Sequence, residues 1–240
     1  MITGASRPLG LGFAVAGQLA ELGYHVVLTA RDAARAEPLA QRLRQDGYSA
    51  EALALDLADH AGIREAAGYL TASFDRLDAL INNASVMPDF ATLSALDADL
   101  DVVRCALEVD VIGPWALVQA LQPLLAAAPA ARIVNVSSVS ALQLATGLDL
   151  GASLRAPAYS MAKHLLNALT VALSRAFADT PILVNAVDPG ETATHPERGG
   201  DADRPAAESA RGVVWAATLG AGGPSGQLFR DRRPLLEHHG

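Results

Sequence analysis

The residues of this chain that point most directly to chemistry are a tyrosine and a lysine four positions apart, Tyr159 and Lys163. Apolar residues at helical spacing over 158–178 predict a helix, and positions i and i+4 share one face of a helix. A free tyrosine has a pKa of about 10, so it is a poor acid–base catalyst near neutral pH. A nearby lysine ammonium stabilises the phenolate. The pair therefore fits acid–base catalysis by proton transfer; the alternative is an exposed surface pair.

Two serines end the apolar run IVNVSS (133–138) and could assist such a transfer. A hydroxyl at the end of a buried strand can donate a hydrogen bond to an oxygen on which negative charge develops. Alternation along the strand does not distinguish Ser137 from Ser138. A structural reading, with both as turn residues, also stays open.

Short apolar runs that alternate with longer helical patterns must position these side chains. The predicted strands are HVVLTA (25–30), SAEALAL (49–55), LDALIN (77–82), RIVNVS (132–137), ILVNAV (182–187) and, more weakly, GQLF (226–229). The predicted helices cover about 9–22, 32–46, 59–74, 97–128, 158–178 and 205–219. This alternation predicts βαβ units, a parallel sheet and helices on both faces. Ligands then bind beyond the carboxyl ends of the strands. The length of 240 residues fits a single domain, 1–240.

Composition excludes several classes of function. A net charge of −8 argues against nucleic acid as a partner. No apolar run is long and uninterrupted enough to predict a membrane span. A single cysteine, Cys105, excludes an internal disulfide framework and favours a reducing, cytoplasmic location. No HxxxH, HExxH or CxxC spacing occurs, so no metal site is predicted.

A glycine-rich stretch, TGASRPLGLG (3–12), precedes the helical pattern FAVAGQLAELG. The N-terminus of a helix offers free N–H groups and the positive end of the dipole, which suits a pyrophosphate. Neither GxGxxG nor GxxxxGK[ST] matches the stretch. Taken alone, it could also be an ordinary turn.

Five motifs, in order along the chain, resemble those of the short-chain dehydrogenase/reductase family. They are TGASRPLG for TGxxxGxG, LINNAS (80–85) for NNAG, IVNVSS for the strand with the catalytic serine, Tyr159 to Lys163 for YxxxK, and VDPGETAT (187–194) for PGxxxT. The resemblance implies an α/β fold, a single Rossmann-type doubly wound domain with a mainly parallel, roughly seven-stranded sheet. It also implies reversible hydride transfer with a nicotinamide cofactor.

The resemblance assigns roles residue by residue. Tyr159 would protonate the carbonyl oxygen, Lys163 would also hold the nicotinamide ribose, and the second serine, Ser138, would be the catalytic one. The cofactor-binding set would be Gly4, Ser6, Arg7, Leu9, Gly10, Arg31, Asp56, Leu57, Asn83, Ala84, Ser85, Tyr159, Lys163, Pro189, Gly190, Thr192 and Thr194.

Three features depart from the family pattern. Asp110, in VDVIG (109–113), replaces the catalytic-tetrad asparagine; an ionised aspartate adds a charge and cannot donate. It is either a tolerated variant, a tuned proton relay paired with Lys163, or a sign of lost activity. Pro8 replaces a glycine, and we expect it to begin the first helix, where its φ is already suitable. Only Met1 and Ile2 precede Thr3 where the family has a strand, so we expect further residues upstream in the natural protein.

The charges near the second strand favour NADP(H). An acidic residue at the end of this strand would bind the ribose hydroxyl of NAD. The sequence instead reads LTARDAA (28–34), with Arg31 after the strand and Asp32 expected to begin the next helix. With Arg7 in the glycine-rich turn, two guanidinium groups suit a 2′-phosphate. Asp56 and Leu57 should border the adenine, as their counterparts in the family do.

The C-terminal stretch 212–235 resembles carbonyl-reductase-type members of the family. The expected activity is reduction of a ketone or aldehyde by NADPH, with a small-molecule carbonyl or alcohol as substrate. The alternative is an NADPH-binding or interaction protein of impaired activity. The segment 140–158 is longer than usual before Tyr159 and contains five leucines, which pack it down or line a substrate mouth. An insert that covers the helix face used for tetramer assembly predicts a monomer or dimer.

Overall fold

The computed structural model describes residues 1–144, 154–193 and 204–235, and the predicted alternation of strands and helices is confirmed there. The strands are β1 (Val26–Ala30), β2 (Ala50–Ala54), β3 (Ala79–Asn82), β4 (Arg132–Val136), β5 (Leu183–Val187), β6 (Leu228–Arg230) and β7 (Arg233–Pro234). The helices are α1 (Leu11–Glu21), α2 (Ala33–Gln45), α3 (His60–Ser73), α4 (Leu100–Leu107), α5 (Gly113–Ala127), α6 (Pro157–Ala176) and α7 (Ala206–Ala217). Three short helical segments are η1 (Ala95–Asp97), η2 (Glu108–Ile112) and η3 (Val139–Leu144).

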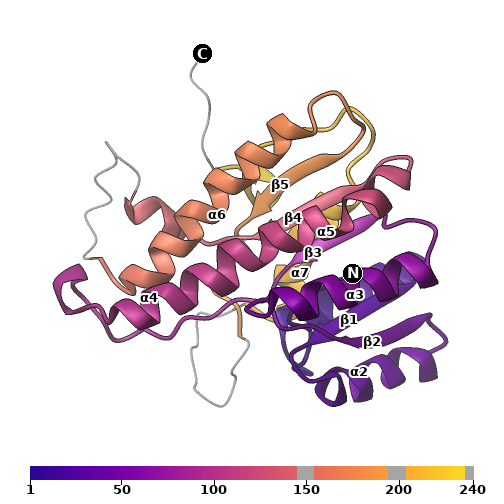
Figure 1. The fold of residues 1–240 in the computed structure, drawn as a ribbon, viewed down its shortest axis with the longest axis horizontal. Helices are drawn as coiled ribbons and strands as arrows, with labels where there is room; N and C mark the ends of the chain where they lie inside the picture. Colours follow the sequence, from indigo (N-terminus) through magenta and orange to yellow (C-terminus); the bar gives the residue numbers. More distant parts are fainter. Residues whose placement is uncertain (145–153, 194–203, 236–240) are drawn as a thin grey trace.

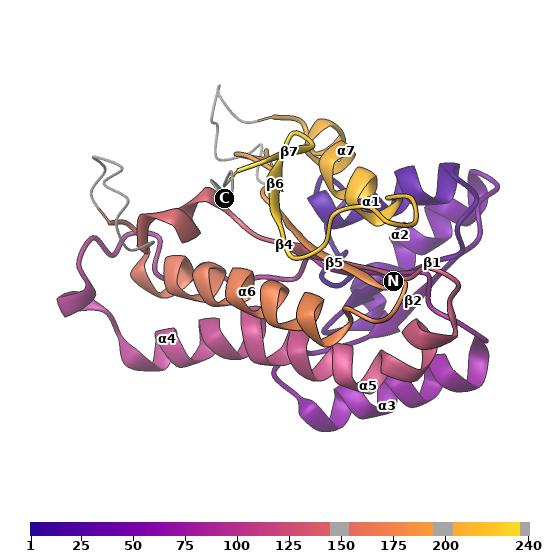
Figure 2. The same cartoon turned by 90° about the horizontal axis from the view of Figure 1, so that it is seen from above.

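The strands form a twisted sheet between two layers of helices (Figure 1). β1 pairs with β2, and β3 to β6 pair in sequence; all these pairs are parallel, and only the β6–β7 pair is antiparallel. Figure 2 shows α1, α2 and α7 on one face and α3, α4, α5 and α6 on the other. The doubly wound α/β class is therefore confirmed.

The short N-terminal segment completes the centre of the sheet. Ile2 forms parallel bridges with Leu28 of β1 and Ile81 of β3, and so joins the two groups of strands. Its N–H donates to the Val27 carbonyl at 2.9 Å, and its carbonyl accepts the Thr29 N–H at 3.0 Å. Met1, Ile2 and Thr3 thus occupy the place of the first strand of the family pattern. The Met1 amino group is buried and donates to the Ala79 carbonyl at 2.8 Å.

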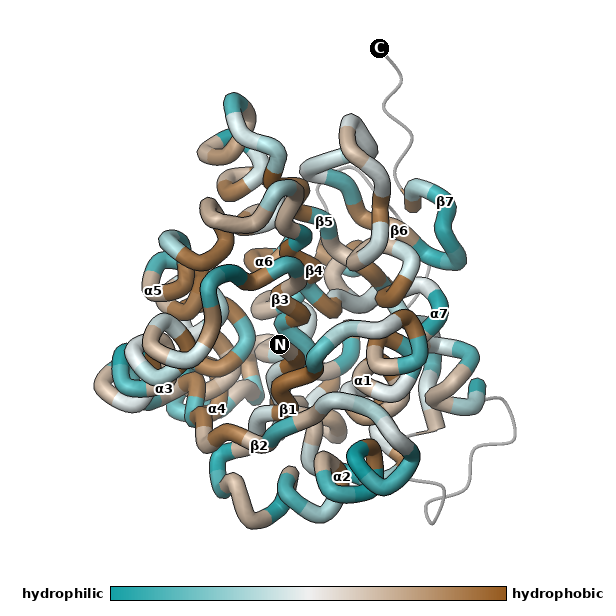
Figure 3. The backbone as a smooth tube through the Cα atoms, turned by 90° about the vertical axis from the view of Figure 1, so that its right-hand side faces the viewer, coloured by the Kyte–Doolittle hydropathy of each residue, from teal (hydrophilic) through white to brown (hydrophobic). Residues whose placement is uncertain are grey.

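Alternation along the strands divides the core between the two faces. In β3, Leu80 packs with the α3, α5 and α6 side chains, whereas Ile81 packs with those of α1 and α7. Ile133 and Val134 of β4 divide in the same way. Figure 3 shows hydrophobic residues, in brown, along these central strands. Burial on both faces requires the continuous apolar runs that predicted the strands.

The predicted helix over 97–128 is in fact three segments in succession: α4, the π-helical η2 and α5. A π turn holds one more residue than an α turn, so it rotates the following side chains relative to α4. By length and composition alone, Leu100–Ala127 could cross a membrane; half of its apolar window is buried in the fold, as in a core helix. The expected strand 226–229 begins later, at Leu228, because Gly226 has a φ of 78° and bonds the Val184 carbonyl.

Candidate active site

The predicted catalytic pair lies on the first turns of α6, at the carboxyl end of β4. Lys163 is almost fully buried, at 2% exposure, and its ammonium donates to the carbonyl of Val136, the last residue of β4, at 2.9 Å. Its Nζ lies 5.5 Å from the centroid of the Tyr159 ring. Tyr159 itself is half-buried. Helical spacing therefore brings the two groups together as the sequence predicted.

Asp110 enters this cluster from the π-helical segment. Its carboxylate is buried, and Oδ2 lies 3.2 Å from the Lys163 Nζ. Oδ1 accepts the Val86 N–H at 3.0 Å, and Oδ2 accepts the Ser85 hydroxyl. Ser85 stands at the glycine position of the NNAG motif, which is a fourth departure from the family pattern, and it contacts Asp110. An aspartate accepts but does not donate, and these donors satisfy it.

The charge on Lys163 is maintained by its neighbours. Burial by itself would lower the pKa of the ammonium, but the Asp110 carboxylate and Tyr159 hold it above the ordinary value. Lys163 is therefore charged at neutral pH, inside a site from which water is largely excluded. A buried ion pair of this kind carries no net charge, whereas the family's asparagine would leave the lysine charge uncompensated.

The two serines have different partners. Ser137 is buried and its hydroxyl donates to Asn167 of α6 at 2.6 Å. Ser138 is half-buried, and its Oγ accepts the Ser140 N–H at 3.1 Å, a contact that leaves its own proton available. The geometry favours Ser138 as a donor to a substrate.

Buried polar side chains, which the sequence analysis missed, fix α6 against the sheet. Asn82 of β3 donates to Asn135 of β4, and Asn135 donates to Thr170 of α6, each at 2.8 Å. The asparagines within the apolar strand runs could have predicted these contacts, because a buried side-chain amide needs a hydrogen-bond partner.

The glycine-rich loop is tied to the loop that follows β3. The Thr3 hydroxyl oxygen accepts the N–H groups of Asn83 and Ala84 at 3.0 and 2.9 Å, and the Asn83 amide donates to the Thr3 carbonyl at 2.8 Å. Gly4 has a φ of 69°, and a Cβ there would overlap Ala84. A Cβ on Gly12, which was not predicted as a site residue, would contact the Asn83 amide nitrogen at 2.7 Å.

The expectation that Pro8 begins the first helix is wrong. The Gly10 N–H donates to the Arg7 carbonyl at 3.0 Å, which closes a turn with Pro8 at its second position. Proline suits that position because its φ is already set. α1 begins at Leu11, with Gly10 as its N-cap.

The N-terminus of α1 fits an anion such as a pyrophosphate. Gly10 has no side chain to cap the helix, and the first turn has no acidic residue. By contrast, α2 and α3 are each capped by an aspartate, Asp32 and Asp59. The orphan N–H groups and the dipole of α1 therefore face the loop without competition from a carboxylate.

Local hydrogen bonds and packing place the residues that follow β1 and β2. Asp32 caps α2 by accepting the Ala34 N–H at 2.9 Å, as expected, so its carboxylate is engaged there. Arg31 and Arg7 are exposed. Asp56 accepts the Ala58 N–H at 3.0 Å, and a Cβ on Gly113 would overlap the backbone of the buried Leu57.

Ser6 is half-buried and Leu9 is 60% exposed in the glycine-rich loop. Beyond β5, Pro189 and Gly190 are half-buried, and the Thr192 hydroxyl donates to Ser209 of α7 at 2.9 Å. Thr194 lies outside the described residues.

Two arginines that were not predicted as site residues, Arg204 and Arg230, contact the loop after β5. A Cβ on Gly190 would lie 3.0 Å from the Arg204 Nε and 3.2 Å from an Arg230 nitrogen. Arg204 binds Asp231 through two hydrogen bonds, and Arg230 lies 3.3 Å from the buried Asp188. Burial raises the pKa of the Asp188 carboxyl, while the Gly190 N–H and both arginines oppose that rise.

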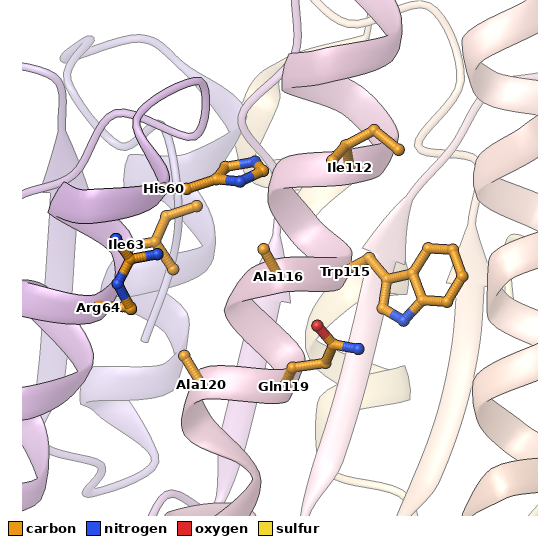
Figure 4. A pocket seen from close by; sticks show the side chains of 8 residues that line it. All are labelled: His60, Ile63, Arg64, Ile112, Trp115, Ala116, Gln119 and Ala120. Atoms are coloured by element: carbon orange, nitrogen blue, oxygen red, sulfur yellow. The ribbon is translucent and has the colours of Figure 1, made fainter.

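A groove on the outer side of α3 and α5 shares no residue with the predicted site (Figure 4). It is lined by His60, Ile63, Arg64, Ile112, Trp115, Ala116, Gln119 and Ala120. His60 contacts Glu108 at 2.8 Å beside it. No acid–base pair like that of Tyr159 and Lys163 lies among these residues.

A doubly wound sheet whose carboxyl edge holds a glycine-rich turn and a Tyr–Lys pair defines a nucleotide-dependent oxidoreductase class. A sequence model described as short chain dehydrogenase matches residues 1–204. The chain belongs to this family, which confirms the resemblance drawn from the motifs.

Individual relatives agree with this assignment. The chain is 34% identical over 191 residues to "Granaticin polyketide synthase putative ketoacyl reductase 1" of Streptomyces violaceoruber; the match covers 79% of this chain and 66% of that protein, just under two thirds. It is 31% identical over 248 residues to "Short-chain dehydrogenase anuI" of Penicillium roqueforti, covering 99% and 95% of the two chains. A metagenomic short-chain oxidoreductase, solved in complex with NADP, superposes with a TM-score of 0.76 at 28% identity, covering 98% and 96% of the chains.

Proposed function

We propose that this chain is an NADPH-dependent carbonyl reductase, which reduces a ketone or aldehyde to an alcohol and catalyses the reverse oxidation. The observation that carries the proposal is the buried Lys163 ammonium, held between the Val136 carbonyl and Asp110 and 5.5 Å from the Tyr159 ring. Burial of a charged group costs free energy, so charged groups with altered pKa values are concentrated at functional sites. Here the buried charge lies beside a side chain that is able to carry a proton.

Each residue has a definite task in this proposal. The Tyr159 hydroxyl donates its proton to the carbonyl oxygen, and Lys163 stabilises the phenolate that remains. Ser138 donates a hydrogen bond to the same oxygen as its negative charge grows. Asp110 fixes the Lys163 ammonium and reduces its electrostatic effect on the phenolate. Bound NADPH would supply the hydride to the carbonyl carbon.

The described residues fit such a cofactor. Gly4, Ser6, Leu9 and Gly10 would surround its phosphates at the uncapped N-terminus of α1. Arg7 and Arg31 would bind the 2′-phosphate, a role that suits guanidinium groups. The remaining contacts would come from Asp56 and Leu57 at the adenine, from 83–85, from Tyr159 and Lys163 at the ribose, and from Pro189, Gly190, Thr192 and Thr194. The relative solved with NADP supports this choice over NAD.

A second candidate function is NADPH binding without efficient turnover. The 3.2 Å contact between Asp110 and Lys163 favours it, because a neutralised lysine stabilises a phenolate less. The intact set of Ser138, Tyr159 and Lys163 favours the enzyme. We therefore interpret Asp110 as a tuned or tolerated variant.

The experiment is to follow NADPH consumption with aldehydes, diketones and quinones, comparing the natural chain with Tyr159→Phe. Turnover that the variant loses by at least ~100-fold would support the reductase. Tight NADPH binding with no turnover of any of these substrates would favour the second function.

We also propose a cytoplasmic protein with a small carbonyl or alcohol substrate and no nucleic-acid or membrane partner. For the assembly, we propose a monomer or dimer. The segment η3 packs on α6, and the Ala141 carbonyl lies 3.1 Å from the His164 ring nitrogen Nδ1. Of the five leucines expected to pack the segment 140–158 or to line a substrate mouth, Leu148 and Leu150 lie outside the described residues. Light scattering on a size-exclusion column tests the proposal, and a tetramer would contradict it.

A further inference from the structure

The helix that holds Tyr159 and Lys163 lacks a cap of its own. Helices α2, α3 and α4 each follow an aspartate whose Oδ1 accepts an N–H two residues later at 2.9 Å; these are Asp32, Asp59 and Asp99. The N-cap of α6 is Ala156, which has no side-chain acceptor, and the next residue is Pro157, which has no N–H. The first N–H of α6 therefore needs an acceptor from elsewhere in the chain.

Asp89, 69 residues upstream in the chain, supplies that acceptor. Its Oδ2 accepts the N–H of Ala158, the residue immediately before Tyr159, at 2.6 Å. Asp89 is 6% exposed and comes from the loop after β3. The Ala156 N–H donates to the Thr92 carbonyl at 2.9 Å, and the Thr92 N–H donates back to the Asp89 carbonyl at 2.8 Å. The turn 89–92 thus holds both residues that flank Pro157.

Further contacts fix the same point. Ala156 has a φ of 50° and a ψ of 64°, a left-handed conformation that costs free energy for any residue but glycine. The Arg155 N–H donates to Gln143 at 3.3 Å, and its guanidinium lies 5.4 Å from the centroid of the Phe90 ring. Strain of this kind persists only where the surroundings impose it.

The second oxygen of Asp89 is buried and has no hydrogen-bond partner within the described residues. A buried carboxylate with one oxygen unpaired is a costly way to cap a helix, because desolvation is only partly offset. An N-cap serine or aspartate at position 156 would stabilise α6 more simply. The arrangement points to a requirement for position rather than for stability.

We propose that Asp89 is a positioning residue for Tyr159: from the loop after β3, it fixes the start of α6 and with it the phenol. The proposal rests on the reductase function proposed above, because it predicts an effect on kcat.

The test compares Asp89→Ala and Asp89→Asn with the control Asp99→Ala, which removes a cap from α4 but none of the hydrogen bonds at the start of α6. We expect Asp89→Ala to lower kcat by ~10–100-fold, the effect of a misplaced catalytic group, with the Kd of NADPH changed less than ~3-fold. Asp89→Asn keeps an acceptor oxygen and should retain kcat within about 3-fold of the natural chain. Should Asp89→Ala not fold, Asp89→Ser, whose hydroxyl is too short to reach Ala158, replaces it. A folded Asp89→Ala variant with unchanged kcat, or an equal loss of kcat in Asp99→Ala, would overturn the proposal.

Amide hydrogen exchange tests the contact without any substrate. The amides of 158–160 should exchange at least ~10-fold faster in Asp89→Ala than in the natural chain or in Asp99→Ala, as expected for a lost cap. Unchanged exchange would overturn the inference even if the protein is a reductase. Faster exchange in a protein that reduces no carbonyl would support the contact and show that the proposed function is what failed.

Discussion

Replacement of Asp110 by asparagine removes one buried negative charge and keeps the shape of the side chain. The Asp110 Oδ2 lies 3.2 Å from the Lys163 Nζ, and Nζ lies 5.5 Å from the centroid of the Tyr159 ring. These distances place the carboxylate within about 9 Å of the ring, where unit charges interact by ~1–2 kcal/mol at an effective dielectric constant of 20–40. Without this repulsion, the phenolate forms more readily. We therefore expect the phenol-dependent limb of the pH–rate profile in Asp110→Asn to move about one unit toward lower pH.

The assay is kcat/KM against pH, measured for alcohol oxidation, which needs the phenolate, and for carbonyl reduction, which needs the phenol. Both limbs should move in the same direction. The ionisable groups next to the Lys163 ammonium in the described part of the chain are Asp110 and Tyr159. Loss of one partner of a buried ion pair can cost ~3 kcal/mol of stability, so circular dichroism must first show a folded variant. A folded variant whose limbs stay in place, or move to higher pH, would refute the reasoning.

Three further results are expected. Arg31→Ala should raise the Kd of NADPH by ~10–100-fold, because a charged hydrogen bond is lost, and should leave the Kd of NADH within about 2-fold. Fluorescence titrations measure both constants, and an equal loss of affinity for the two cofactors would contradict the assigned 2′-phosphate site. Ser138→Ala should lower kcat by ~10²-fold, whereas Ser137→Ala should mainly lower the denaturation midpoint; the reverse would exchange their roles. In a chain that begins at Met1 with a free amine, burial lowers the pKa of that amine from 8.0 to about 5, with the Asp78 charge opposing. The amine of the unfolded chain is protonated below about pH 8, whereas that of the folded chain is protonated only near pH 5. The contribution of this amine to the free energy of unfolding is therefore full above pH 8 and falls by about 4 kcal/mol as the pH falls toward 5. Urea denaturation across this range tests the effect, and a chain extended upstream, with no buried amine, should not show it.

The sequence predicted the fold class and the proximity of Tyr159 to Lys163 because both follow from local periodicity. Strands buried on both faces need continuous apolar runs, and a helix puts Tyr159 and Lys163 on one face. Pairing of Asp110 with Lys163 was one of the alternatives left open for that aspartate, and the two groups lie 3.2 Å apart. Asp32 was expected to cap the following helix, and it does.

Other features depend on contacts between distant segments, which a local pattern does not encode. The π-helical segment 108–112 reads as ordinary helix, because one added residue per turn leaves the apolar spacing almost unchanged. Pro8 lies in a turn and not in the helix because the Gly10 N–H donates to the Arg7 carbonyl. The contact of Asp89 with Ala158 joins residues 69 apart, and no composition or spacing predicts it.

The most direct test of the central claim is NADPH-dependent reduction of a carbonyl by the purified chain and by Tyr159→Phe. The variant keeps the ring and the buried Lys163 but has no proton to donate. We expect measurable turnover of at least one carbonyl class by the natural chain, a loss of at least ~100-fold in kcat in the variant, and NADPH affinities within about 3-fold of each other. Equal turnover by both proteins would show that Tyr159 is not the proton donor and would contradict the account.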